Sequence, residues 1–145
     1  DLGPAHLLRP DAMGLCYPVA VSWGHTHQGS FDNLCGEDEK LKERLSLDRL
    51  ARPDMPPVYL WHTRDDGSVP CRNSLILTKT MEQMGIQVGL RLYLHGKHGL
   101  SLANEQVYPV GQVPSHSPGL PAWPEEMMDF FEEIGLKIKD LEQSL

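Results

Sequence analysis

The stretch LWHTRDDGSVP, residues 60–70, lies where a short apolar run gives way to polar and acidic side chains. The run from Val58 to His62 predicts a buried β-strand. Two adjacent acids, Asp65 and Asp66, follow it, and Gly67 indicates a turn. Because ligands bind beyond the carboxyl ends of the strands in open parallel sheets, these acids mark a candidate functional edge of the fold.

Strands and helices alternate along the rest of the chain. Apolar runs predict one strand over Ala12 to Val21 and another over Val88 to Leu94. Helices are predicted over residues 36–50, over Asn73 to Met84, and from Pro124 onward. The resulting order, β-α-β-α-β-α, predicts an α/β fold with a parallel sheet as the middle layer of a three-layer α/β/α arrangement.

The predicted sheet is small for a parallel sheet that is covered on both faces. We therefore expect residues 1–145 to form a single partial domain, with loops at residues 22–33 and in the Pro- and Gly-rich segment 104–122. The last helix has an apolar face that is expected to belong to the core. Its members are Met127, Phe130, Phe131 and Ile134.

The charge balance argues against two classes of partner. The 145 residues carry a formal net charge of −7, whereas nucleic-acid or anionic-membrane binding needs clustered Lys and Arg. No apolar run approaches the roughly 20 residues of a membrane span. Cys16, Cys35 and Cys71 are odd in number and widely spaced, so we expect reduced thiols and a cytoplasmic protein. Because the chain opens with Asp1 instead of Met, we expect that residue 1 is not the natural N-terminus.

Each predicted strand leads into a loop with chemically active side chains. A carboxylate that accepts a hydrogen bond from His Nδ1 fixes the tautomer of the ring and leaves Nε2 free as a base. The candidates are Trp23, His25 and His27 after the first strand, Asp65 and Asp66 after the second, and His95 and His98 after the third. Their spacing matches no zinc signature, so we expect no metal site, and no motif indicates a cofactor.

Two of these loops resemble a known family. The stretches LWHTRDDGSVPCRNSL (60–75) and LYLHGKHGLSLA (92–103) resemble the last two catalytic loops of the α/β-hydrolase family, and more narrowly of its bacterial esterase and acetyl-xylan-esterase-like group. RPDAMGLCYPV (9–19) and HQGSFDNLCGED (27–38) resemble the segments that precede them there. The pairing of D-x-x-V-P with a later H-G is more specific than either motif alone.

The resemblance implies roles for single residues. The family's acid lies four residues before the proline of D-x-x-V-P, which points to Asp66 and leaves Asp65 as a turn or solvent residue. The family's histidine precedes a glycine after the last strand, which points to His98 and leaves His95 as a structural residue. The order acid, then histidine, along the chain is the family order.

The nucleophile of the family pattern is absent from the sequence. The family carries its serine in a G-x-S-x-G motif before the acid, and no such motif occurs in the 145 residues. The nearest imitation, Ser115 to Gly119, follows His98 in the Pro-rich segment, so we reject it. The resemblance therefore implies that the chain corresponds to the C-terminal half of an α/β-hydrolase fold, with the serine on a segment before Asp1.

The implied activity is that of a carboxylic ester hydrolase with a small-molecule ester substrate. The resemblance suggests sugar-bound acetyl groups, and the sequence leaves the acyl group and the alcohol open. Trp23 and Phe31 are expected to line the substrate pocket. Without the serine, the chain alone is expected to be inactive.

A second interpretation stays open. Asp66 then belongs to a solvated turn, and the chain is a non-catalytic α/β fragment or an assembly module. Such a module would pair, through the free edge of the strand over Ala12 to Val21, with a missing N-terminal half or with a second copy. A G-x-S-x-G motif upstream of residue 1 would favour the enzyme.

Overall fold

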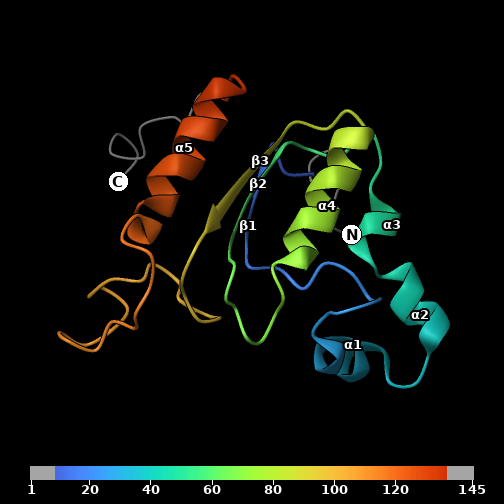
Figure 1. Ribbon diagram of the computed structural model, residues 1–145. Helices are drawn as coiled ribbons and strands as arrows, with labels where there is room; N and C mark the ends of the chain where they lie inside the picture. The colour runs from blue at the N-terminus through green and yellow to red at the C-terminus, as the bar shows by residue number, and fades with distance from the viewer. Residues whose placement is uncertain (1–8, 137–145) are drawn as a thin grey trace, which may run out of the picture.

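The computed structural model describes residues 9–136, which form one parallel sheet with helices on both faces. Its strands are β1 (Met13–Cys16), β2 (Val58–Thr63) and β3 (Val88–Tyr93), in the spatial order β1-β2-β3 (Figure 1). Both pairings are parallel. The carboxyl ends of β2 and β3 therefore lie at the same edge of the sheet, where their loops can meet.

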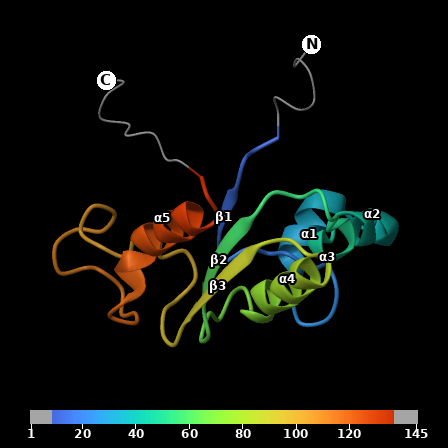
Figure 2. The same ribbon diagram turned by 90° about the horizontal axis from the view of Figure 1, so that it is seen from above.

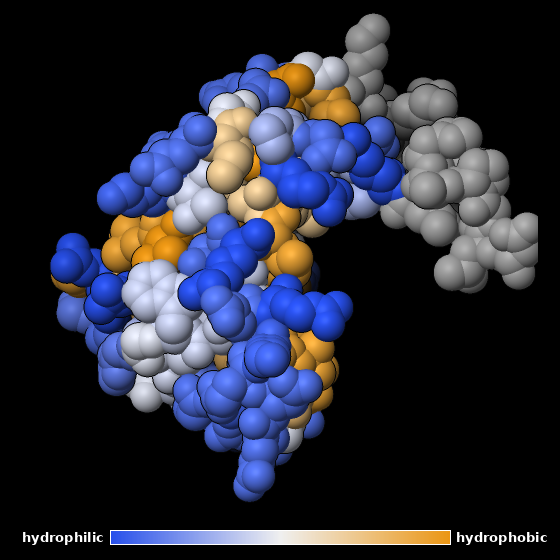
Figure 3. Space-filling model, turned by 90° about the vertical axis from the view of Figure 1, so that its right-hand side faces the viewer, coloured by the Kyte–Doolittle hydropathy of each residue, from blue (hydrophilic) through white to orange (hydrophobic). Residues whose placement is uncertain are grey.

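The α-helices of residues 9–136 lie on both sides of the sheet. They are α1 (Gln28–Cys35), α2 (Glu39–Arg44), α3 (Leu47–Leu50), α4 (Arg72–Gln83) and α5 (Trp123–Glu133). Figure 2 shows α5 on one side of the strands and α1 to α4 on the other. The expected three-layer α/β/α arrangement is confirmed. The side that carries α2 and α3 is largely hydrophilic, with separate apolar patches (Figure 3).

Strand β2 joins two hydrophobic cores, because every one of its residues is buried and successive side chains point to opposite faces. Val58 and Leu60 belong to the core under α4, together with Leu77 and Met81 of that helix. On the other face lies the core under α5. Its buried members are Tyr59, Trp61, Tyr93, Leu100, Ala103 and Leu120. The turn that follows β2 is thus attached to the most buried element of the fold.

Helix α5 begins with residues that suit a helix N-terminus, as the prediction of a helix from Pro124 onward implied. Pro124 lies in its first turn, where a missing N–H costs no hydrogen bond, and Glu126 suits the positive end of the helix dipole. Glu126 Oε2 also accepts hydrogen bonds from the hydroxyl groups of Tyr59 (3.1 Å) and Tyr93 (2.9 Å). Burial, followed by the bond to Glu126, raises the pKa of Tyr93 to about 12, so the phenol stays a donor. Gly135, with φ +84°, follows the end of the helix.

The prediction of one helix over residues 36–50 was wrong. Two short helices, α2 and α3, occupy this stretch, and α1 lies in the segment that was predicted as a loop. The break falls at Ser46, whose fully buried side chain accepts a hydrogen bond from Ser22 N (2.9 Å) and donates one to Asp48. A serine that bonds its side chain in this way offers the backbone an alternative to a continuous helix.

The predicted strand over Ala12 to Val21 is shorter than expected. It ends at Cys16, because Tyr17 adopts a positive φ of 40° and Pro18 has no N–H to donate. Ala20 and Val21 are nevertheless buried in the core under α4. Their apolar character reflects that burial, although they are not part of the sheet.

The buried Asn73, in the first turn of α4, replaces the missing strand pairing at this point. Its Oδ1 accepts hydrogen bonds from Ala20 N (3.0 Å) and Val21 N (3.1 Å), and its Nδ2 donates to Pro70 O (3.0 Å). Asn73 therefore ties the segment after β1 to the turn after β2.

Within residues 9–136, β1 pairs with β2 alone, so one edge of β1 carries no other strand. No helix in the same range is long and apolar enough to cross a membrane.

We predict that Asn73→Ala lowers the free energy of unfolding by about 3 kcal/mol, because two buried backbone N–H groups lose their acceptor. Urea denaturation followed by circular dichroism measures the change. Asn104→Ala is the matched control, since Asn104 Oδ1 bonds only the exposed Gln106 N, and about 0.5 kcal/mol or less is expected there. Equal effects of the two variants would contradict the assigned role of Asn73.

Candidate active site

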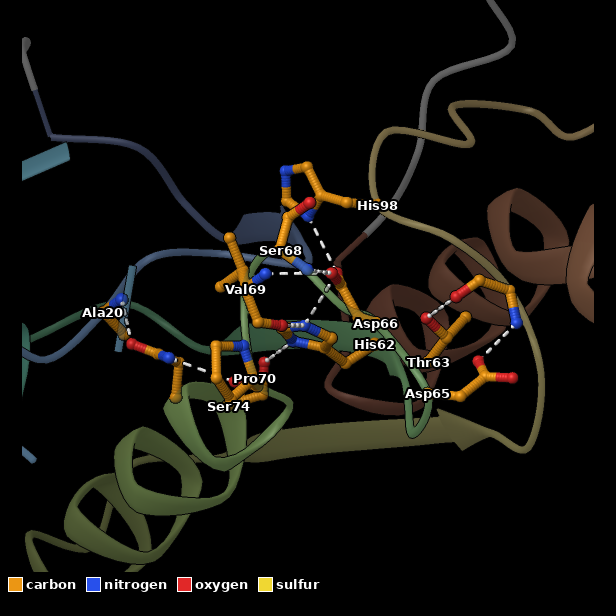
Figure 4. Close-up of polar contacts among 12 residues, drawn as sticks. Ala20, His62, Thr63, Asp65, Asp66, Ser68, Val69, Pro70, Ser74 and His98 are labelled. Atoms are coloured by element: carbon orange, nitrogen blue, oxygen red, sulfur yellow. Dashed lines mark hydrogen bonds and ion pairs between the residues drawn. The ribbon is translucent and has the colours of Figure 1, made fainter. Parts of the chain in front are cut away.

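The carboxyl edge of the sheet brings Asp66 and His98 together (Figure 4). Asp66 lies in the turn after β2, and His98 lies in the loop after β3. The side chain of Asp66 is fully buried, and the distance from its Oδ2 to His98 Nδ1 is 2.7 Å. The contact between Asp66 and His98 that the resemblance to the family motifs implied is present.

The turn itself fixes the carboxylate of Asp66. Its Oδ1 accepts hydrogen bonds from Ser68 N and Val69 N, both at 2.9 Å. This is the local side-chain-to-backbone pattern of an Asx turn, and it explains the acid, glycine and serine at this point of the sequence. One carboxylate oxygen is thus bonded to the turn, and the other faces the imidazole.

His62, near the end of β2, contacts the same turn through its buried side chain. Its fully buried ring lies with Nδ1 2.8 Å from Ser74 Oγ and with Nε2 2.9 Å from Val69 O and 3.4 Å from Asp66 Oδ2. Burial lowers the pKa of His62, against the opposing effects of the Val69 carbonyl and Asp66. A neutral ring with its proton on Nε2 fits these partners, because that proton points toward two oxygens.

Tyr17 packs its ring against the imidazole of His98. The two ring centroids are 4.8 Å apart with planes at 70°, an edge-to-face contact. The hydroxyl of Tyr17 accepts a hydrogen bond from Ser101 N at 3.3 Å, and burial raises its pKa. The positive φ of Tyr17, 40°, is strained for a residue with a side chain, and such strain concentrates at functional sites.

A second acid–histidine pair lies beside the first. Asp65 Oδ2 is 3.0 Å from His95 Nδ1, and Asp65 Oδ1 accepts a hydrogen bond from Gly96 N at 2.7 Å. The bonds from His95 and from Gly96 lower the pKa of Asp65. The prediction that Asp65 is a turn or solvent residue was incomplete. Its side chain is half exposed, yet both of its oxygens are engaged.

The residues expected in a substrate pocket lie in different surroundings. Trp23 is 42% exposed, and its indole Nε1 donates to Asp48 Oδ2 at 2.8 Å. Phe31 is buried beside a small apolar cavity of about 150 Å³ that Leu34 and Leu45 also line. Among the described residues, no hydrogen bond or ring contact joins either side chain to Asp66 or His98. A substrate-binding role stays a prediction for both.

His62 and Tyr17 contact Asp66 and His98, respectively, and neither was predicted from the sequence to belong to this site. The sequence gives a weak indication for His62, since it is a titratable residue within an otherwise apolar strand. It gives none for Tyr17, because the contact of Tyr17 with His98 depends on the backbone bend that ends β1. Over residues 9–136, no three His, Cys, Asp or Glu side chains group closely enough to hold a metal ion.

The chemistry available here is proton transfer at His98 Nε2. Asp66 holds Nδ1, so the proton of the neutral ring is placed on Nδ1 and Nε2 is left as the base. The side chain of His98 is one-third exposed, which leaves its ring accessible from solution. The arrangement can accept a proton from a nucleophile and return it to a leaving group.

Comparison with known proteins identifies relatives. No family model matches the chain. It is 32% identical over 103 residues to endo-1,4-beta-xylanase B of Butyrivibrio fibrisolvens, a match that covers 69% of this chain and 16% of the xylanase.

Two solved structures are similar to the chain in both fold and sequence. An acetyl ester-xyloside bifunctional hydrolase from Caldicellulosiruptor lactoaceticus has a TM-score of 0.74 at 36% identity, over 88% of this chain and 43% of the hydrolase. A carboxylesterase from Lactobacillus plantarum has a TM-score of 0.71 at 29% identity, over 86% of this chain and 45% of the esterase. The chain thus spans less than half the length of these relatives. In fold and in sequence, the chain is similar to esterases with the α/β-hydrolase fold.

Proposed function

We propose that Asp66 and His98 are the acid and the base of a serine-type carboxylic ester hydrolase. The observation that carries the proposal is the 2.7 Å contact between a buried, turn-fixed carboxylate and the Nδ1 atom of a partly exposed imidazole. This is the orientation that the base of a Ser-His-Asp triad requires. The serine is supplied by a segment outside the 145 residues, since the sequence contains no G-x-S-x-G.

The geometry defines what each group does in the reaction. The serine hydroxyl attacks the acyl carbon while His98 Nε2 accepts its proton, and the resulting imidazolium returns that proton to the leaving alcohol. Asp66 holds the ring in place and stabilises the imidazolium. Backbone N–H groups near the serine stabilise the oxyanion. Water then repeats the sequence and releases the acid.

The proposed substrate is an acetyl ester on a xylose-containing carbohydrate. The names of two relatives support this class, since one is an acetyl ester-xyloside hydrolase and the other a xylanase. The half-exposed indole of Trp23 is a suitable surface for a sugar ring, because its hydrogen bond to Asp48 fixes its orientation.

A second candidate function is that of a non-catalytic assembly module. The observation that favours it is the edge of β1, which carries no other strand within the described residues. In that case the Asp66–His98 pair only stabilises the turn. Activity of a longer protein separates the two functions.

We predict that the 145-residue chain does not hydrolyse p-nitrophenyl acetate, whereas the protein extended upstream to include G-x-S-x-G does. In the extended protein, His98→Ala is expected to lower kcat/KM by about 10³-fold or more. His27→Ala is the matched control, since the exposed ring of His27 contacts Ser30 Oγ and, among the described residues, forms no other hydrogen bond; it should change kcat/KM by less than about twofold.

Two results would contradict this assignment. One is an extended protein that retains full activity in His98→Ala. The other is turnover by the chain alone that disappears in His98→Ala but persists in both Ser115→Ala and Ser117→Ala, which would reveal an unrecognised nucleophile.

We also predict that the 145-residue chain self-associates at micromolar concentration, because one edge of β1 carries no other strand within residues 9–136 and its backbone groups can pair with another chain. Light scattering tests this directly. A monodisperse monomer that unfolds cooperatively would show that the edge is protected in solution.

A further inference from the structure

The position of His98 depends on a short loop. β3 ends at Tyr93, and His98 follows five residues later, so the intervening backbone sets where the imidazole lies. A loop of this kind needs fixed contacts, since a displacement of about 1 Å at a catalytic group is enough to impair catalysis. The relevant contacts converge on Gly96.

Both backbone polar groups of Gly96 are bonded to side chains from the end of β2. Asp65 Oδ1 accepts from Gly96 N at 2.7 Å, and Thr63 Oγ1 donates to Gly96 O at 2.6 Å (Figure 4). The other oxygen of Asp65 is 3.0 Å from His95 Nδ1. Three contacts therefore attach the loop to the end of β2 and to the turn that also contains Asp66.

The opposite side of the loop is held by the Pro-rich segment. Ser117 N donates to His95 O, and His95 N donates to Ser117 Oγ, both at 2.8 Å. Gly96 forms an isolated antiparallel bridge with His116. The backbone at residues 95–96 is thus fixed between the end of β2 and residues 116–117.

Position 96 is so tightly packed that a side chain there would force neighbouring side chains to move. A Cβ on Gly96 would lie 2.6 Å from Leu100 Cδ1 and 2.8 Å from Thr63 Cγ2. The glycine allows the close approach that the bonds from Asp65 and Thr63 require.

We propose that Asp65 is a positioning residue, which holds the backbone of the histidine loop at Gly96 so that His98 reaches Asp66. The two adjacent acids then divide the work. Asp66 orients the imidazole ring, and Asp65 fixes the main chain two residues before it. The inference rests on the proposed catalytic role of His98, but the contacts it invokes can be tested without any activity.

The test uses the 145-residue chain and hydrogen–deuterium exchange of the segment around Gly96, together with the proton resonance of His98 Nδ1–H. Asp65→Ala is expected to accelerate exchange of the Gly96 amide about tenfold or more, because that N–H loses a charged acceptor. The Nδ1–H resonance, identified by its absence in Asp66→Ala, should weaken or broaden. Amides in β2 and α4 should keep their exchange rates.

Two variants define the role further. Asp65→Asn keeps an oxygen for Gly96 N–H and is expected to stay within about threefold of the wild-type exchange rate. Thr63→Val removes the donor to Gly96 O at nearly constant volume and should act in the same direction as Asp65→Ala, which keeps the test decisive if Asp65→Ala fails to fold. Asp129→Ala, at an exposed acid on α5, is the matched control and should change neither readout.

The proposal is overturned if Asp65→Ala leaves both readouts unchanged, since Asp65 would then be a solvent residue. It is also overturned if exchange accelerates equally throughout the chain, since Asp65 would then contribute only general stability. Neither readout requires esterase activity. If the esterase proposal is wrong, the exchange rate and the Nδ1–H resonance still test the role of Asp65, so the two failures are distinguishable.

Discussion

The buried carboxylate of Asp66 is the constraint on which the rest of the site depends. A carboxylate removed from water is costly unless hydrogen bonds replace its hydration. Here the N–H groups of Ser68 and Val69 satisfy one oxygen, and the imidazole of His98 satisfies the other. The turn, the buried acid and the histidine loop are therefore mutually dependent, because each supplies partners that the others need.

Strand β2 supplies or supports the groups that hold Asp66 and His98 in place. The strand is buried on both faces, and three side chains at its end or just after it support the site. His62 supports the turn, Thr63 bonds the loop of His98, and Asp65 bonds the same loop at the next position but one. Helix α4 adds Ser74 and Asn73, whose side chains bond His62 and the segment after β1. A rigid central strand thus sets the distance between an acid and a base that lie 32 residues apart.

The sequence allowed the central features of this arrangement to be predicted. The hydrophobic periodicity and the composition of the sequence predicted β2, β3, α4 and the start of α5 within one or two residues of their observed bounds. Parallel strands bring their carboxyl ends together, so the loops after β2 and β3 were expected to meet. The choice of Asp66 and His98 within those loops came from the resemblance to the family motifs, not from local patterns.

The features that escaped prediction depend on tertiary contacts. The sequence pattern of residues 36–50 predicts one helix. The stretch is divided into α2 and α3 at Ser46, whose buried hydroxyl accepts a hydrogen bond from Ser22 N. The bend at Tyr17 and the paired bonds of Asp65 follow from how distant segments meet, which no local pattern encodes. The position of Phe31 beside a small apolar pocket likewise depends on α1, a helix that the composition of its segment did not indicate.

The central claim is that Asp66 and His98 act as a single unit. A double-mutant cycle in the upstream-extended protein tests it most directly, with kcat/KM on an acetyl ester measured for Asp66→Ala, His98→Ala and the double variant. If the acid works through the histidine, the double variant should be no less active than His98→Ala alone, within about twofold. Losses that multiply in the double variant would show that the two residues act independently, and would contradict the account.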